Sequence, residues 1–490
     1  MNLLDDPWIP VHEHGATRDI DLASLLTQNA PRTLSLPRDD MESAALQLLI
    51  ALTQTLFTPA DGAAYRRRLR TPLTRAEYQA AVRDYRHWFA LFHPHTPFMQ
   101  TRGVNAAEPT PIQKLFVGLP AGITPTFINP VDAIRAVCPR CAAIALFNQA
   151  TSAPSIGGGF KNPLRGNGPI TTLLAGRDLR ETIWLNVLTQ DTIRQHYPQA
   201  TAPVTPTWID PLRRQATYRA PEIGLSRGLF WQPLHVELLP TAAGGRCEAC
   251  QGDSPHLIPA FNKAPFTFNV EGLWLHPHSP RQWELHQGAP TRVRYRTFNS
   301  SAPTWHQLNH YLLAGSTEQP ALVVQQGQAQ LPESLPIRLL VSGYRTRQSL
   351  VLERRHELFT LPLLWPDQAG IRQLEAGLTF ALAVRQILRG QVFYASKQLG
   401  APLLTAVEQQ FDNGSRNLVH ALFTEMTRRE RQQAMLAFND AVIRLAYALF
   451  EQAVHPYHHT VRGIAACAPI RANLRRKLAA LPPGEPHAGR

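Results

Sequence analysis

Residues 435–450 read MLAFNDAVIRLAYALF, and their large apolar side chains recur at intervals of three and four positions. The side chains on this stripe are Met435, Phe438, Val442, Leu445 and Leu449. Steps of three and four place side chains on one face of an α-helix, which has about 3.6 residues per turn. The stretch therefore predicts a long helix whose apolar face packs inside a helix bundle.

The segments around this stripe repeat the helical pattern. After Trp365, glycine and proline become scarce, and four segments have the spacing of helices: residues 370–389, 402–426, 427–454 and 460–481. Four helices with short connections are typical of a four-helix bundle. Cys467 lies on the apolar stripe of the last segment, which predicts a buried, unpaired thiol.

The chain before about Pro362 differs in composition from the C-terminal part. It is rich in proline and glycine, and turn signals break its short apolar runs, which favours short strands, short helices and long loops. Helices are expected over residues 41–56 and 75–92, and strands over 229–238, 266–270 and 337–341. We therefore expect an α+β fold, with a large mixed domain over residues 1–362 and a four-helix bundle over residues 366–490.

Composition limits the classes of function. The chain has 490 residues, a hydrophobic fraction of 44% and a net charge of +13, and only five of its 49 basic residues are lysine. This composition excludes a mainly disordered chain and favours a polyanionic partner such as nucleic acid, although a GC-rich genome would also enrich arginine. The acidic N-terminus and the lack of an apolar run of about 18 residues predict a soluble, cytoplasmic protein.

Two Cys-x-x-Cys pairs are the strongest local motif. They are Cys138–Cys141 and Cys247–Cys250, with 105 residues between them. Two such pairs can supply four thiolates to one tetrahedral metal ion, so we expect a structural zinc site that joins distant parts of one domain. A thioredoxin-like redox pair and unbound thiols remain alternatives.

A run of three glycines is the most conspicuous loop. Gly157, Gly158 and Gly159 can adopt positive φ and can bring backbone close to a ligand. Lys161 and Arg165 follow, and bare backbone beside positive charge suits a phosphate backbone or a narrow DNA groove. The loop has neither the Walker A nor the Rossmann pattern, and the glycines alone are equally compatible with a flexible turn.

No set of residues forms a recognisable catalytic motif. The histidine-rich tracts at residues 276–278 and 455–459 lack a matching carboxylate pattern, so we expect surface turns there and not hydrolytic metal sites. We therefore expect no catalytic residues and no enzymatic activity.

Several motifs lie in a fixed order along nearly the whole chain. They are LPRDDME (36–42), PFMQT (97–101), ALFNQ (145–149), GGGFK (157–161), PTWIDP (206–211), RGLFWQP (227–233), HPHSP (276–280) and LERRH (352–356). In these motifs the sequence resembles the large subunit, CasA, of the type I-E CRISPR Cascade surveillance complexes.

This resemblance implies a non-catalytic recognition subunit. Such a subunit reads the protospacer-adjacent motif (PAM) of duplex DNA through the minor groove, begins strand opening and R-loop formation, and recruits a helicase–nuclease. The implied partners are the other Cascade subunits, the CRISPR guide RNA, the target duplex and its displaced strand. Protein reads the short motif in such systems, and base pairing reads the rest.

The resemblance also assigns roles to individual residues. Gly157, Gly158 and Gly159 match the loop whose backbone lies against the PAM. Gln348 matches a glutamine wedge inserted beneath the PAM, where a planar amide replaces lost stacking. Phe127 and Asn129 match a loop that docks near the guide handle and the PAM.

Two departures from the family pattern concern the DNA contacts. Pro265 stands where the family has a minor-groove lysine, so either Lys263 takes that role from a shifted loop or the PAM is read differently. Thr346 and Arg347 precede the wedge where asparagines are usual. The expected DNA-binding set is Gly157, Gly158, Gly159, Lys161, Lys263, Arg347, Gln348, Phe127 and Asn129. A stand-alone zinc-containing enzyme and a structural scaffold without DNA contact remain rival hypotheses.

Overall fold

The computed structural model describes residues 1–119, 133–200, 205–287, 289–300, 302–332, 337–347, 350–361, 368–428 and 431–482. It confirms the predicted fold class, because short strands and helices precede a C-terminal helical region. The chain forms two compact units. The first comprises Met1–Ser300, Ser316–Gln330 and Leu340–Leu358, and the second comprises Ser301–Gly315, Leu331–Leu339 and Phe359–Arg490.

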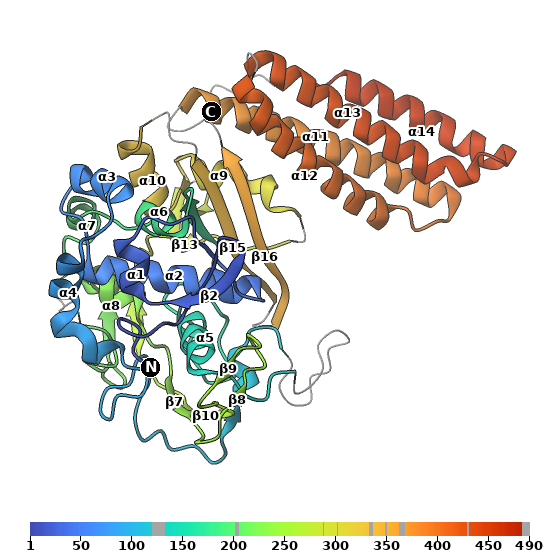
Figure 1. Ribbon diagram of the computed structural model, residues 1–490. Coiled ribbons are helices and arrows are strands. Elements are labelled where there is room, and N and C mark those ends of the chain that lie inside the picture. The colour runs from blue at the N-terminus through green and yellow to red at the C-terminus, as the bar shows by residue number, and fades with distance from the viewer. Residues whose placement is uncertain are drawn as a thin grey trace. The chain divides into compact units, whose positions relative to one another are not determined.

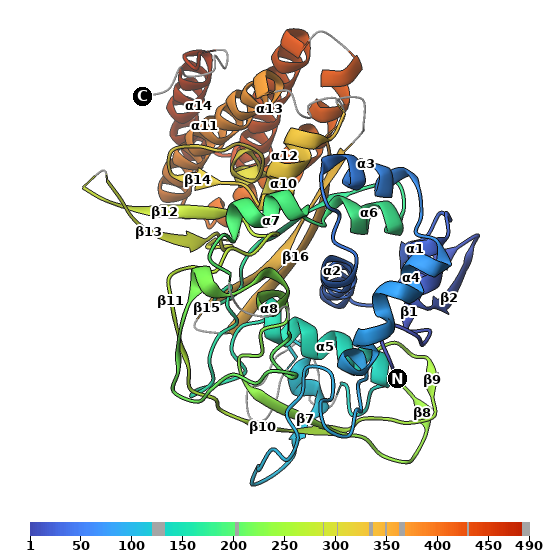
Figure 2. The ribbon, with the colours of Figure 1, turned by 90° about the vertical axis from the view of Figure 1, so that its left-hand side faces the viewer.

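Helix α2 (Asp39–Leu56) is the core helix of the first unit. Its residues are buried almost continuously from Asp40 to Gln54, because other helices cover it on several sides. It packs against α5 (Pro139–Thr151), α6 (Leu179–Leu185) and α8 (Leu225–Leu229), and Figure 2 shows it between α5 and α6. Three acidic residues occupy its first turn, where they favour the helix dipole.

Shorter helices surround this core. The segment expected as one helix over residues 75–92 is an α-helix only to Val82 and then continues as a 3₁₀-helix to Phe89. The other α-helices of the unit are α1 (Leu22–Thr27), α3 (Gly62–Arg70), α4 (Arg75–Val82), α7 (Gln190–His196) and α10 (Leu322–Gln330). The 3₁₀-helices are η1 (Arg83–Phe89), η2 (Ile112–Leu115) and η3 (Ala220–Glu222).

The strands form small sheets. Among the described residues, four sheets have three strands, in the orders β2-β1-β3, β4-β10-β7, β13-β12-β14 and β16-β15-β5, and two are pairs, β11-β6 and β8-β9. The strands are β1 (Ile9–Glu13), β2 (Ala16–Ile20), β3 (Thr33–Leu34), β4 (Thr110–Pro111), β5 (Thr171–Ala175), β6 (Thr217–Arg219), β7 (His235–Leu239), β8 (Gly245–Arg246), β9 (Asp253–Ser254), β10 (Ala260–Ala264), β11 (Asn269–Glu271), β12 (Arg281–His286), β13 (Ala289–Tyr295), β14 (Glu318–Gln319), β15 (Ile337–Arg347) and β16 (Leu350–Leu361).

The expected strands differ from the observed ones at their ends. Residues 229–238 contain the end of α8 and a strand that begins only at His235, because Phe230 and Trp231 pack into the aromatic core instead of continuing a ladder. In the segment 266–270, Phe266 and Phe268 are buried and only the end joins β11. Strand β15 extends beyond the expected Val341 to Arg347.

Four long helices dominate the second unit and lie side by side in Figure 1. Helix α11 packs against the other three, and α12 packs against α13. The stripe in α13 is buried at Met435, Phe438, Val442 and Leu449, as predicted. The four helices are α11 (Gln368–Leu399), α12 (Leu404–Arg428), α13 (Arg431–Val454) and α14 (Val461–Ala479). The unit also contains η4 (Thr304–Gln307), α9 (Leu308–Leu312) and η5 (His455–Tyr457).

Two details of this bundle refine the sequence reading. Helix α11 continues ten residues beyond the expected end at Arg389 and stops before Gly400, which has a φ of +65° and suits a helix C-terminus. Cys467 is buried and unpaired, as predicted. Within the described ranges, we find no helix with the length and apolarity needed to cross a membrane.

Candidate metal centre and nucleic-acid interface

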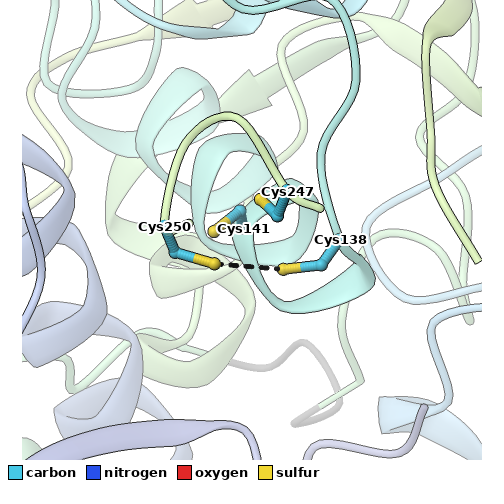
Figure 3. A group of neighbouring side chains, drawn as sticks. All are labelled: Cys138, Cys141, Cys247 and Cys250. Carbon is cyan, nitrogen blue, oxygen red and sulfur yellow. Dashed lines mark hydrogen bonds between the residues drawn. The ribbon is translucent and has the colours of Figure 1, made fainter. Parts of the chain in front are cut away.

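The four cysteines of the two Cys-x-x-Cys pairs meet at one place, although the pairs are distant in sequence (Figure 3). Their sulfur atoms all lie within 4.8 Å of one another, and the Sγ atoms of Cys138 and Cys250 are 3.8 Å apart. A zinc ion with Zn–S bonds of about 2.3 Å holds its tetrahedral sulfur ligands about 3.8 Å apart. The spacing of the described cysteines is therefore compatible with a four-thiolate zinc site.

Local structure explains how each pair is formed. Cys138 is the N-cap of α5, Pro139 occupies the first helical position, and Cys141 lies in the first turn. The second pair lies in a tight turn between β8 and β9, where the backbone N–H of Cys247 donates to the carbonyl of Gly252 at 2.8 Å. Backbone hydrogen bonds thus hold both pairs in place without a metal ion.

Neighbouring groups favour a thiolate at Cys247 and Cys250, whereas hydrogen bonds within the cluster and burial raise the pKa values of Cys138 and Cys141. The guanidinium of Arg140 donates to the Sγ of Cys250 at 3.0 Å, which stabilises a negative charge on sulfur. Hydrogen bonds from the thiols of Cys138 and Cys141 lower the pKa of Cys247 to about 6. All four cysteines are free of disulfide bonds.

The triple-glycine loop presents bare backbone to solvent. Gly157, Gly158 and Gly159 are exposed, and a Cβ at any of them would meet no atom within 4 Å. Gly159 has a φ of +83°, in the region that favours glycine. The loop is closed by its own hydrogen bonds, since Ser155 Oγ donates to the Gly157 carbonyl at 3.0 Å and Phe160 N–H donates to the same carbonyl at 3.3 Å.

Lys263 lies beside this loop. Its Nζ stands 4.9 Å from the ring centroid of Phe160, the residue that follows the three glycines. Lys263 belongs to β10, which is about a hundred residues further along the chain. The fold therefore brings together two segments that the sequence singled out separately. Lys161 is half-buried on the same loop.

Strand β15 runs against the segment that follows the loop. Gly168 has a φ of +65°, and a Cβ there would lie 2.8 Å from the Tyr344 carbonyl oxygen and 3.0 Å from Cγ2 of Thr346. Only glycine permits this close approach. Arg347, at the end of β15, is exposed. Phe127, Asn129 and Gln348 lie outside the described residues.

The expectation that Arg165 supplies positive charge to a ligand is wrong. Its side chain is buried, and burial lowers its pKa to about 10. It lies after the glycine loop and donates to the carbonyl of Thr151, which lies before the loop, so it joins the two ends of the loop. Its acceptors are the Thr151 carbonyl at 2.8 Å, Thr171 Oγ1 at 2.9 Å, Ser279 Oγ at 3.0 Å, Gln47 Oε1 at 3.1 Å and Ser152 Oγ at 2.7 Å.

The expectation of a surface turn at residues 276–278 is also wrong. His276 and His278 are fully buried, and burial lowers the pKa of His278 to about 3. The backbone N–H of His278 donates to Nδ1 of His276 at 3.1 Å, and its Nε2 lies 3.2 Å from the Asn186 carbonyl. The preceding Trp274 and Leu275 were the sequence signal for burial. In the second histidine tract, His455 is exposed in η5.

Sequence reasoning missed a buried polar network near the start of α2. The hydroxyl of Tyr344 donates to Asp40 Oδ2 at 3.1 Å and accepts from Asn148 Nδ2 at 2.7 Å. The hydroxyls of Ser43 and Ser342 lie 2.8 Å apart. These contacts join α2, α5 and β15, and no spacing in the sequence indicates them, because each pair is far apart along the chain.

Comparison with known proteins gives a consistent result. The family model of the CRISPR-associated protein Cse1 matches residues 2–449. The CRISPR-associated protein CasA/Cse1 of Thermus thermophilus is 27% identical over 267 residues, so the alignment spans about half of this chain and half of that relative.

Solved structures show the same fold. The structure is similar to that of Thermus thermophilus CasA (Cse1), with a TM-score of 0.78 and 19% identity over 98% of this chain and 99% of that chain. It is also similar to a chain of a CRISPR RNA-guided surveillance complex, with a TM-score of 0.72 and 17% identity over 97% of this chain and 99% of that chain. Because the family model covers most of the sequence, this chain belongs to the family of the CRISPR-associated protein Cse1.

Proposed function

We propose that this chain is the non-catalytic DNA-recognition subunit of a type I-E RNA-guided surveillance complex, Cascade. In this role it reads the PAM of duplex DNA through the minor groove, starts strand opening and R-loop formation, and recruits a helicase–nuclease. The observation that carries the proposal is the exposed glycine loop with Lys263 beside Phe160. Family membership and the similarity to a chain of an RNA-guided surveillance complex support it.

The loop suits a DNA groove for physical reasons. Its three glycines carry no side chains, so a base edge or sugar can approach the backbone closely, and its own hydrogen bonds keep its shape. Lys161, Lys263 and Arg347 add positive charge on the segments around it. The net charge of +13 would further attract the target duplex and the displaced strand.

The remaining expected contacts belong to the same proposal. Gln348 follows directly after β15 and Arg347, and we assign it the wedge that replaces base stacking when the first pair opens. Phe127 and Asn129 are assigned to a contact near the guide handle and the PAM. The other Cascade subunits and the guide RNA are the proposed partners in the assembled complex.

We assign structural zinc to Cys138, Cys141, Cys247 and Cys250. A bound zinc ion would crosslink the start of α5 to the β8–β9 turn. Four thiolates fill a tetrahedral shell, which leaves no position for water or substrate, so this metal would supply no catalysis. We further assign residues 1–362 to a DNA-reading domain and residues 366–490 to a separate bundle domain.

The test is to co-express the chain with the other subunits and a guide RNA and to measure duplex binding by the purified complex. We expect co-purification, tighter binding to duplexes that carry the PAM, and affinity that falls steeply with salt. Duplex affinity that is the same with and without the PAM, and with and without this chain, would support the rival hypothesis of a structural scaffold. Catalytic turnover by the isolated chain that is lost when zinc is removed would support the rival hypothesis of a zinc-containing enzyme.

A further inference from the structure

Three sequence motifs to which the proposed function gives no role meet at one cavity of the first unit. The motifs are PFMQT (97–101), PTWIDP (206–211) and RGLFWQP (227–233), and among the residues that they supply to the wall are Thr101, Trp208 and Gln232. The cavity has a volume of about 500 Å³, part of which is open to solvent. Ligand sites are typically clefts of roughly 300–1,000 Å³ with aromatic walls and a few fixed polar groups.

Aromatic rings form part of the wall. The rings of His235 and Phe266 meet edge to face, with their centroids 4.5 Å apart. The indole Nε1 of Trp208 donates to the Trp88 carbonyl at 2.7 Å, which fixes the orientation of that ring. A flat ligand that packs against rings already held in place orders few side chains, so little of its binding free energy is lost.

The polar groups of the wall are also fixed, and one of them has a donor to spare. Oγ1 of Thr101 lies 2.8 Å from Nδ1 of His235. The Thr207 hydroxyl donates to Oε1 of Gln232 at 3.1 Å, whereas the buried Nε2 of Gln232 has no hydrogen-bond partner among the described residues. A buried donor without an acceptor is unfavourable, so a ligand that brings an acceptor to Nε2 is favoured.

The chain next to the cavity is basic. Arg213 and Arg214 directly follow the lining residue Leu212 and are exposed, and within the described ranges no carboxylate pairs with either of them. Arg102 also lines the cavity, but Glu237 forms an ion pair with it at 3.1 Å. The two unpaired guanidinium groups favour a ligand that carries a phosphate.

The cavity adjoins the strand that carries Lys263. The lining residue His235 pairs with Ala264 in the β7–β10 ladder, and Phe266 follows Lys263 by three residues, a length of chain that spans at most about 11 Å. Lys263 in turn contacts Phe160 beside the three glycines. The cavity is therefore a neighbour of the segments that we assign to duplex DNA, where strand opening would produce unpaired bases.

We propose that this cavity binds one unpaired nucleobase of a nucleic-acid strand. A nucleobase is flat and aromatic, offers acceptors to the N–H of Gln232, and is attached to a phosphate that Arg213 and Arg214 can neutralise. The displaced DNA strand and the handle of the guide RNA are the two sources of such a base. The inference rests on the proposed function, because both strands belong to the assembled complex.

The experiment measures the Kd of the assembled complex for PAM duplexes in which a single nucleotide of the displaced strand lacks its base, one position at a time. We expect one position where the loss of the base raises the Kd about tenfold, because stacking on aromatic side chains contributes on this order. Leu212→Trp fills the cavity and should abolish this difference between the natural and abasic strands. Gln232→Leu removes one hydrogen bond and should reduce the difference to about twofold.

The matched control is Gln391→Leu in α11. The Asn473 amide donates to Oε1 of Gln391 at 3.1 Å, and the buried Nε2 of Gln391 also has no partner in the part of the chain that the structure describes, but Gln391 does not line the cavity. The control should keep the full tenfold difference. Because natural and abasic strands are compared on the same complex, partial unfolding of a variant lowers both affinities and leaves their ratio unchanged.

The same scan along the guide handle distinguishes the two sources of the base. If retention of the guide depends on one handle base, and the cavity variants remove that dependence, the base belongs to the guide RNA. If neither strand has a position that responds to the cavity variants, the proposal is overturned. Loss of the other subunits from both variants would then make the cavity a contact with protein.

Two outcomes separate this inference from the proposed function. If the unmodified complex shows no preference for PAM duplexes, the proposed function fails, and the scan of the guide handle still tests the cavity. If the complex prefers PAM duplexes but no position responds to the cavity variants, only the nucleobase site fails.

Discussion

At Gly158 a substitution can change DNA recognition without changing the stability of the fold. A Cβ there would meet no atom within 4 Å, and unlike Gly157 and Gly159 it does not have a positive φ. We therefore expect Gly158→Ala to leave the Tm of the free chain unchanged and to weaken PAM binding by the complex about tenfold, because only the DNA would meet the added methyl group. Gly158→Asp adds a negative charge and should weaken binding about a hundredfold.

The control for this substitution is Gly315→Asp. Gly315 is also exposed, without a positive φ and without any atom within 4 Å of an added Cβ. It should leave both the Tm and the duplex affinity unchanged. Duplex binding that survives both substitutions at Gly158 would mean that the loop is an ordinary surface turn.

Gln348 is expected to act after PAM contact, at the first step of strand opening. We expect Gln348→Ala to slow guide-dependent unwinding of a fully paired duplex about tenfold or more, because the wedge offsets an unstacking cost of about a few kcal/mol. In a target whose first base pairs are mismatched, those pairs are already open and no unstacking cost remains for the wedge to offset. Unwinding of this substrate should therefore be nearly unaffected. The measurement compares unwinding rates on the two substrates. Equal loss on both would make Gln348 a simple binding contact, and no loss on either would make it a solvated turn residue.

At the scale of elements, the cysteine cluster connects the β8–β9 turn to the start of α5, which are also joined by the ion pair of Arg135 with Glu248 and by a hydrogen bond from the Glu248 backbone N–H to the Ala136 carbonyl. The β8–β9 turn is a pair of two-residue strands, and α5 begins on the other side of the cluster. Such short strands supply little stability of their own. A shared metal would add to these contacts in stabilising the turn.

We expect metal analysis of the purified chain to find about one zinc per molecule, since four thiolates fill one shell. Cys250→Ser should abolish zinc binding and lower the Tm by about 5–10 °C, a shift that corresponds to a few kcal/mol. The matched control is Cys467→Ala, which removes a buried thiol outside the cluster and should keep the zinc. A metal-free protein with an unchanged Tm would contradict the zinc site.

Arg165 shows how one side chain positions a whole element. The glycine loop leaves α5 after Thr151 and returns to Arg165 before β5, and the guanidinium holds both ends through five acceptors without a carboxylate partner. A buried cation is tolerated here because its donors are satisfied. The bare backbone of the loop is thus held on a rigid base although its tip is exposed.

At the scale of the whole molecule, the buried imidazoles couple stability to pH. His276 and His278 both have pKa values lowered by burial, to about 3 for His278, while an unfolded histidine has the ordinary value of 6.5. The unfolded chain therefore binds more protons below pH 6.5. Above pH 6.5 the two imidazoles do not lower the free energy of unfolding. As the pH falls from 6.5 toward 3, the free energy of unfolding decreases, by about 2 kcal/mol at pH 5 for each imidazole that stays neutral in the folded chain.

This pH dependence can be measured by urea unfolding at pH 7.5 and pH 5.0. His278→Gln keeps an amide that can donate to the Asn186 carbonyl but cannot titrate, so we expect a smaller loss of stability at pH 5.0 in the variant than in the parent. The difference between the two losses should be about 2 kcal/mol. Identical losses would show that other groups control the acid response.

The sequence by itself determined the features that depend on neighbours along the chain. The stripe from Met435 to Leu449 predicted the bundle helix, and the Cys-x-x-Cys spacings identified the four cysteines that meet. Family motifs drew attention to the glycine loop and to Lys263. These inferences succeed because helical periodicity, capping and chelating turns are local properties.

Only the tertiary structure decided which polar residues are buried and which distant segments touch. Arg165 looked like a ligand contact and is a buried anchor, and His276 looked exposed and is buried. The contact of Lys263 with Phe160 joins segments about a hundred residues apart. Burial of a charged side chain depends on acceptors supplied by remote parts of the chain, and no local pattern of residues records where those acceptors will lie.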